Sequence, residues 1–284
     1  MMDASWVKTV CVCGTVVVCA VVMSNAGPLD PPGGPVTSTM RTLDEVSGRI
    51  PINQTNTPGN AGALFRITSS GSYYLTRDWT VGQDQTGIEI AAQDVTIDLN
   101  GRALIGEGLF TTQSGDGSNR ASGSLAGSVT IRNGIIRGFD GAGVDFTDRA
   151  DQLLIEGVTA IGCTGGFLVT DYSVVRRCIA RDCQNFGFAA PFFGGGADGG
   201  TIEDNIAINC DVGFLFANTN SGHVIVRNRA YDCATDGYVF GAGNAVGPIV
   251  NVLDPFPPFD PNQFDGLTNF ILLRPGTARA DESR

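Results

Sequence analysis

The residues best suited to chemistry lie in one short acidic stretch, DGAGVDFTDRAD. Asp145 and Asp148 fall on and just after a short strand, where an enzyme would place a general acid and a general base. Asp140, Asp151 and Arg149 flank this pair and would contact a substrate. Such carboxylates also suit calcium, which prefers oxygen ligands. The alternative is a solvated acidic loop, and the residues alone leave these interpretations open.

The charge of the chain restricts the partners that it can bind. The 284 residues include 18 Lys and Arg against 29 Asp and Glu, for a formal net charge of −11 at pH 7. Lys8 is the one lysine, so arginine supplies every base in the rest of the chain. An acidic surface repels phosphate backbones and anionic lipid, and it repels polyuronates unless calcium intervenes. The composition therefore argues against nucleic acid as a partner.

The first 26 residues are typical of a secretory signal peptide. Lys8 precedes the apolar run VCVCGTVVVCAVVM, and Ser24-Asn25-Ala26 fits a small-x-small cleavage site. The run of about 14 apolar residues is shorter than the roughly 20 that a spanning helix needs, although an uncleaved anchor is the alternative. We expect cleavage before Gly27, no membrane insertion afterwards, and a location in the periplasm, at the cell surface or outside the cell.

A repeat recurs through the middle of the chain. An aliphatic residue is followed at fixed offsets by valine, cysteine or asparagine, then by alanine, then by cysteine. The four copies run from Ile155 to Cys163, from Val175 to Cys183, from Ile202 to Cys210 and from Ile225 to Cys233. Their cysteines are 20, 27 and 23 residues apart, a spacing that is typical of solenoid coils.

Each cysteine is followed by a turn glycine and a short alternating strand, as in Gly166-Phe167-Leu168-Val169. One such unit cannot bury its apolar face alone, so successive copies must stack. The sequence therefore predicts an all-β, single-stranded parallel β-helix, or solenoid, of about seven or eight coils with an N-terminal cap. The predicted parts are a signal peptide at 1–26, a proline- and glycine-rich linker leading into the cap at 27–63, the solenoid at 64–251, and a proline-rich covering segment with a disordered tail at 252–284.

Stacking places equivalent residues of successive coils over one another, about 4.8 Å apart. The predicted inward ladders consist of Cys163, Cys183, Cys210 and Cys233, of Phe167, Phe188, Phe214 and Tyr238, and of Asn205 and Asn228. We interpret the cysteines as buried free thiols, with one disulfide that involves Cys178 as the alternative. After the leader the chain has no CxxC pair, and the wide spacings fit no common zinc motif, so we expect no metal site built from cysteine.

Several of these segments resemble the right-handed parallel β-helix repeats of the pectate-lyase-like superfamily. The resemblance rests on VTIDLNGRALIG, on VTIRNGIIRGFDGAGV and on the four cysteine repeats, and it covers roughly residues 64 to 251. Asn205 and Asn228 match the family's internal asparagine position, whereas Val158 and Cys178 depart from it. The resemblance implies a right-handed β-helix. It implies no single activity, because the superfamily includes lyases, hydrolases, epimerases and binding proteins.

His223 is the single histidine of the chain. Its surroundings, NTNSGHVIVRN, loosely resemble polygalacturonase motifs, but Asn220 stands where those enzymes have aspartate and Val224 where they have glycine. We therefore expect His223 to be a loop residue between coils rather than a catalytic group.

Two outward rows follow from the stacked register. Arg132, Glu156, Arg176 and Glu203 alternate in sign, and each is expected to meet an opposite charge on a neighbouring coil. The other row begins at Asp145 and continues as an apolar stripe of Leu168, Ala189, Leu215 and Val239. Such a stripe suggests a surface that is covered by a loop or by a second copy in a homo-oligomer.

The sequence supports two functional hypotheses. The first is a non-catalytic secreted or cell-surface protein whose long sheet face binds carbohydrate or serves as an assembly surface, without a cofactor. The alternative is a polysaccharide lyase, hydrolase or epimerase that uses the acidic cluster, with calcium as the one cofactor it would need. The first is favoured because the chain contains no recognisable catalytic set.

Overall fold

The computed structural model describes residues 48–107, 116–120, 127–146, 152–169, 172–190, 199–216, 222–252 and 269–272. The predicted signal peptide and most of the predicted C-terminal segment lie outside these residues. Every regular element within them is a β-strand. In this part of the chain no helix has the length and apolar character of a membrane span.

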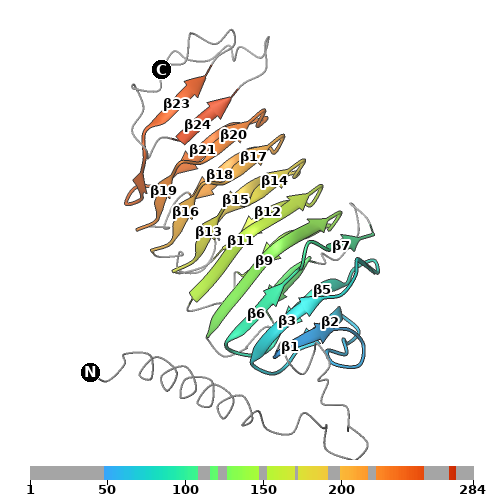
Figure 1. The fold of residues 1–284 in the computed structure, drawn as a ribbon. Helices are drawn as coiled ribbons and strands as arrows, with labels where there is room; N and C mark the ends of the chain where they lie inside the picture. The colour runs from blue at the N-terminus through green and yellow to red at the C-terminus, as the bar shows by residue number, and fades with distance from the viewer. Residues whose placement is uncertain are drawn as a thin grey trace, which may run out of the picture. The chain divides into compact units, whose positions relative to one another are not determined.

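The strands form two sheets of parallel strands. The coils that contribute these strands are stacked in chain order, from β1 in blue to β24 in red (Figure 1). The 16-stranded sheet consists of β1 (Arg49–Ile52), β3 (Gly71–Leu75), β4 (Trp79–Val81), β6 (Val95–Asp98), β7 (Ala103–Gly106), β9 (Ser128–Arg137), β11 (Gln152–Ile161), β13 (Val174–Arg176), β14 (Ile179–Arg181), β16 (Thr201–Glu203), β17 (Ile206–Ile208), β19 (Val224–Val226), β20 (Arg229–Tyr231), β22 (Ala245–Val246), β23 (Ile249–Val252) and β24 (Asn269–Leu272). The eight-stranded sheet consists of β2 (Ala63–Ile67), β5 (Thr86–Ile90), β8 (Ser118–Arg120), β10 (Ala142–Asp145), β12 (Gly165–Leu168), β15 (Phe186–Ala189), β18 (Val212–Phe216) and β21 (Asp236–Phe240). Together they make a β-solenoid of about 7 turns, which confirms the predicted fold class.

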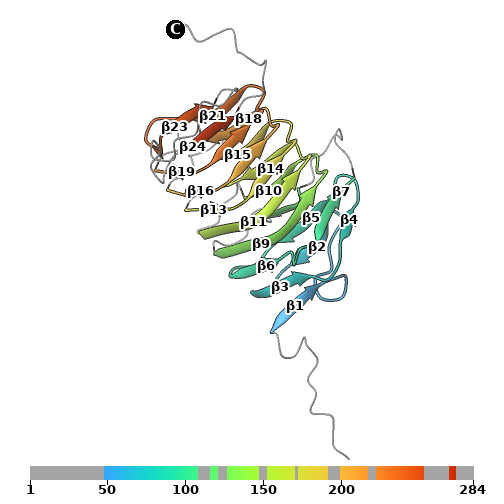
Figure 2. The ribbon, with the colours of Figure 1, turned by 45° about the horizontal axis from the view of Figure 1, so that its top comes forward.

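The strand stack is longer than the predicted range 64–251. At the N-terminal end β1 pairs in parallel with β3, from within the segment that was predicted to lead into the cap. At the C-terminal end β24 pairs with β20, inside the predicted covering segment. Figure 2 shows both ends of the stack and the eight-stranded sheet beside the larger one.

The longest strands bend where the backbone enters the left-handed region. In β11 the buried residues are Leu153, Ile155, Val158 and Ala160, so the alternation shifts by one residue at Gly157, which has φ 62°. Equivalent left-handed residues recur on other coils, at Asn133, Arg177, Asp204 and Arg227. These residues divide each coil's share of the large sheet into two short faces with different outward directions.

Aromatic rings fill the centre of the solenoid. Phe167, Phe188, Phe214 and Tyr238 occupy equivalent register positions in the smaller sheet. Their rings stack face to face, with 4.9 Å between the centroids of each successive pair. This distance equals the spacing of parallel strands, so backbone pairing and ring stacking reinforce each other.

Gly166, Gly187 and Gly213, each before an aromatic residue, are needed because a side chain there would clash with the next strand of the same sheet and with the alanine ladder of the other sheet. A Cβ added at Gly187 would lie 2.7 Å from the carbonyl oxygen of Gly213 and 2.9 Å from the Cβ of Ala207. At Gly166 the corresponding distances are 2.3 Å to the Gly187 oxygen and 2.8 Å to the Ala180 Cβ. The alternation of glycine and alanine in the repeat therefore follows from the available space.

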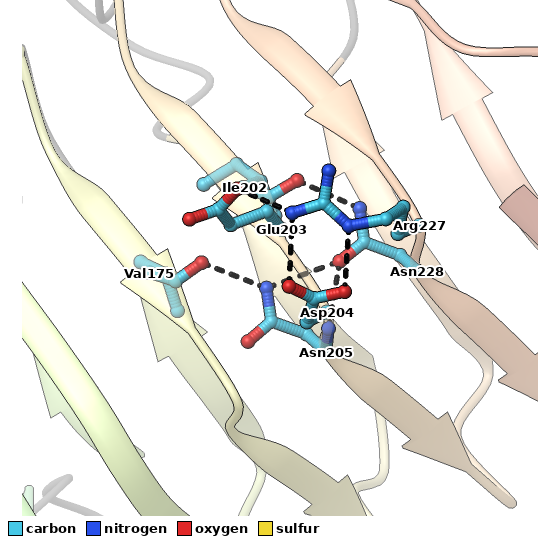
Figure 3. A network of polar contacts seen from close by, with 7 residues as sticks. All are labelled: Val175, Ile202, Glu203, Asp204, Asn205, Arg227 and Asn228. Carbon is cyan, nitrogen blue, oxygen red and sulfur yellow. Dashed lines mark hydrogen bonds and ion pairs between the residues drawn. The ribbon is translucent and has the colours of Figure 1, made fainter. Parts of the chain in front are cut away.

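Two buried asparagines link three coils by hydrogen bonds (Figure 3). The Oδ1 atom of Asn205 accepts from the Cys178 amide at 2.9 Å, and its Nδ2 donates to the Val175 carbonyl at 2.8 Å. Asn228 repeats the arrangement one coil further on: its Oδ1 accepts from the Asn205 amide at 3.0 Å, and its Nδ2 donates to the Ile202 carbonyl at 2.8 Å. Both side chains are 0% exposed, so they satisfy backbone groups that no water reaches.

We expect Asn205→Ala to lower the free energy of unfolding by about 2–4 kcal/mol, because it leaves the Cys178 amide and the Val175 carbonyl buried without their partner. Urea unfolding followed by circular dichroism measures the change. As a control, Gln184→Ala, at an exposed position on a turn, should change stability by no more than about 0.5 kcal/mol. Equal effects of the two substitutions would contradict a stabilising role for the asparagine ladder.

Candidate functional site

An open groove of about 630 Å³ lies on the outward face of β9, β11 and the β13 region. Its lining combines hydroxyl, amide, aromatic and guanidinium groups with aliphatic side chains. The groups that could bind a ligand are Ser128, Thr130, Gln152, Tyr172 and Arg176, beside the aliphatic Leu154 and Val174. They come from three consecutive coils, because β9 pairs with β11 and β11 with β13.

Tyr172 is the most exposed of the large apolar or aromatic side chains in the described residues, at 62%. Its φ is 51°, which is unusual for a bulky residue and is worth examining for a functional reason. The edge of its ring lies beside Gly199, where an added Cβ would lie 3.4 Å from the ring's Cε1 atom. The ring is therefore supported by the next coil and remains open to solvent.

Arg176 brings a positive charge to the groove. Its guanidinium lies 3.2 Å from the Glu156 carboxylate, at the Nη2 and Oε2 atoms. Glu156 also forms an ion pair with Arg177 through its other oxygen. One carboxylate therefore serves two guanidinium groups, which leaves Arg176 with donor capacity for a ligand.

Each member of the predicted row of alternating charges meets an opposite charge on a neighbouring coil, as expected, but some of these partners lie outside the row. Arg176 does meet Glu156, but Arg132 pairs with Asp98 at 3.3 Å, and Glu203 pairs with Arg227 at 2.7 Å (Figure 3). The partner of Glu203 lies outside the row, because Arg227, at the bend of the next coil, reaches both Glu203 and Asp204.

The acidic stretch is only partly described. Asp145 lies half-buried at the end of β10, between the buried Val144 and Phe146. Asp140 lies half-buried at the turn before β10. Asp148, Arg149 and Asp151 lie outside the described residues, so their predicted catalytic and substrate-binding roles stay predictions.

The structure adds a carboxylate that the sequence analysis missed. Asp116 accepts a hydrogen bond from the Ala142 amide at 2.8 Å and another from Asn119 Nδ2 at 3.1 Å. Burial raises the pKa of Asp116 to about 6, with the Asp145 carboxylate as the next cause, while both hydrogen bonds lower it. Its serine- and glycine-rich surroundings give no periodic signal, so sequence alone could not place Asp116 beside Asp145.

The outward row on the smaller sheet is polar in the early coils and apolar in the later ones. Glu89, Asn119 and Asp145 are stacked in register, and Leu168 follows Asp145. In the predicted apolar stripe Ala189 is 0% exposed, although its position next to the inward Phe188 places it on the outward row. Its methyl group lies in register between Leu168 and Leu215, which are half-buried, as is Val239. A homo-oligomer through this stripe stays a prediction.

His223 lies in the loop before β19, as predicted, and its side chain is buried. Its side chain is 0% exposed, its ring packs edge-on against Phe216, and its Nδ1 accepts a hydrogen bond from the Gly200 amide at 3.0 Å. The residue precedes β19, and the coil presents its side chain to the core.

A family model described as a right handed beta helix region matches residues 67–229, which is more than half of the chain. The chain belongs to the right-handed β-helix family. The β-helix thus winds with the hand that the sequence resemblance implied. Searches of the curated proteins and of the solved structures found no match.

Within the described part of this β-helix, no three His, Cys, Asp or Glu side chains are grouped so that they could hold a metal ion. Calcium as a cofactor therefore stays a prediction that rests on the acidic stretch as a whole.

We expect a carboxyl-carbon NMR titration to give Asp116 a pKa near 6, against the ordinary value of 3.8. Asp145→Asn should lower this pKa but keep it above 3.8, because burial remains. The folded β-helix then holds this proton more tightly than the unfolded chain, so the contribution of Asp116 to stability decreases as pH rises from about 4 to about 6. An unchanged Asp116 pKa in the variant would show that the two carboxylates do not interact.

Proposed function

We propose that this protein is a non-catalytic carbohydrate-binding β-helix and that the groove beside Tyr172 holds the glycan. The exposed ring of Tyr172 at the rim of a polar groove is the observation that supports this proposal most directly. The predicted leader at 1–26 would export such a protein to the place where polysaccharides occur.

The groove offers the kinds of contact that a sugar needs. An aromatic ring presents a flat apolar face, and Tyr172 remains open on the side away from Gly199. Ser128, Thr130 and Gln152 supply neutral hydrogen-bonding groups, and Arg176 supplies charged donors. A concave site with a few convergent polar groups is the usual form of a ligand-binding site.

The scaffold favours an extended ligand. The groove crosses β9, β11 and the β13 region, which belong to three consecutive coils joined by continuous parallel pairing. Groups on paired strands keep fixed separations, so little order has to be gained when a ligand binds. A glycan of several residues can therefore contact more than one coil at once.

We expect Tyr172→Asn to weaken binding of the preferred glycan by about tenfold or more, which is about 1.4 kcal/mol or more. Asparagine tolerates the left-handed backbone at this position, so the loss would come from the ring and not from strain. Isothermal titration calorimetry against a panel of neutral and acidic oligosaccharides, with and without calcium, measures the effect.

The matched control is Tyr231→Asn, which removes a tyrosine that is 39% exposed on β20, outside the groove lining. Binding should be unchanged in this variant. If no member of the panel binds to the wild-type protein, or if both tyrosine variants bind as the wild type does, the groove is not the glycan site.

A second candidate function is polysaccharide cleavage at the acidic stretch, and the raised pKa of Asp116 beside Asp145 favours it. A pair of carboxyl groups whose environments separate their pKa values is the usual arrangement for acid and base roles at sugar bonds. Asp145→Asn should then abolish the release of reducing ends or unsaturated uronates. Absence of turnover in the wild type across the same panel would exclude this candidate and leave binding alone.

A further inference from the structure

Four cysteines form a continuous row inside the β-helix. Cys163, Cys183, Cys210 and Cys233 follow β11, β14, β17 and β20, one on each coil. All are free thiols, and their exposed fractions range from 0% to 8%. Each Sγ donates to the carbonyl two residues earlier in the chain, as Cys183 does to Arg181 at 3.6 Å, so the side chains share one orientation.

Cys183 and Cys210 lie directly over each other on adjacent coils. Ala180 and Ala207 are register partners, and each cysteine follows its alanine by three residues. Parallel strands lie about 4.8 Å apart, which falls within the Cα separation that a disulfide tolerates. A bond between these two sulfur atoms therefore requires side-chain rotation rather than a shift of the coils.

The Cys210 Sγ also donates to the Ala180 carbonyl at 3.8 Å, which brings it toward the coil of Cys183. Interaction between the two thiols raises the pKa of Cys183, with burial as the next cause, and it lowers the pKa of Cys210. Burial instead raises the pKa of Cys163 to about 11 and that of Cys233 to about 12. Of the four ladder thiols, Cys210 is the one whose pKa is lowered, which favours its thiolate, and Cys183 is stacked on it on the adjacent coil.

We propose that Cys183 and Cys210 form a redox-active dithiol that a small peroxide converts to a disulfide between two coils. Both residues are 2% exposed, so the oxidant must be close to water in size, as hydrogen peroxide is. The stacked side chains must rotate to form the bond, and a disulfide strained in this way is easily reduced. The modification is therefore reversible by small thiols.

The reaction balances in two steps. The Cys210 thiolate attacks one peroxide oxygen, the O–O bond breaks, and hydroxide leaves as Cys210 becomes a sulfenic acid. The Cys183 thiol then attacks the Cys210 sulfur, and the expelled hydroxide takes the Cys183 proton and leaves as water. The hydroxide of the first step takes the proton that Cys210 released when it ionised. Two thiols and one hydrogen peroxide give one disulfide and two waters.

Treatment of the folded full-length chain with hydrogen peroxide tests the proposal. The remaining thiols are then alkylated under denaturing conditions, and each cysteine is followed by peptide mass spectrometry. We expect Cys183 and Cys210 to lose most of their alkylation together, to appear in one linked peptide that is lighter by two hydrogens, and to recover on reduction. Cys163→Ala should leave this result unchanged, whereas Cys210→Ala should remove the linked peptide.

The wild-type map decides the matter even if a variant fails to fold. A bridge that joins a different pair, or retention of both thiols under conditions that oxidise a small free thiol completely, would overturn the proposal. Loss of alkylation that reductant does not restore would also overturn it, because that result indicates sulfinic acid rather than a disulfide.

Discussion

The structure depends on residue-over-residue pairing between parallel coils. Once Ala180 is placed over Ala160 and Ala207 over Ala180, the inward phenylalanines and aliphatic residues of those coils also stack on neighbours of the same kind. The stacked rings, the glycines that admit the alanine ladder and the linked asparagines are all consequences of this one register. A shift by a single residue would turn the aromatic row outward, so the apolar contacts and the backbone pairing select the same alignment.

The same register also stacks the outward side chains, but there repetition of one residue type is not always favourable. On the inside, repetition of one residue type is favourable because apolar groups pack on their equivalents. On the outside, repetition of a charge would be repulsive, and the coils avoid it by drawing partners from the bends. Arg176 and Arg177 both form ion pairs with Glu156, and Arg227 forms ion pairs with Glu203 and Asp204. The groove lies where this neutralisation leaves a guanidinium beside hydroxyl and amide groups.

The interior was predictable from the sequence and the site was not. The stack fixes the spacing of alanine, cysteine, glycine and phenylalanine in each coil, so this spacing in the sequence predicts the fold and its ladders. Tyr172 and Asp116 give no such signal, because their neighbours in space come from other coils and their local sequences have no period. His223 shows the same limit: its loop position was predictable, but its burial was not, because the preceding coil supplies the amide and the ring that hold it inside.

The coils of the stack differ in the number of residues that they contain. Successive alanines of the inner ladder are separated by 20, then 27, then 23 residues, yet their strands pair in the same alignment. The pairing thus constrains only a part of each coil, and the junctions between strands are free to differ in size and composition. In such a solenoid, recognition segments can be inserted between strands on successive coils, at regular intervals along the axis, without any change to the paired strands.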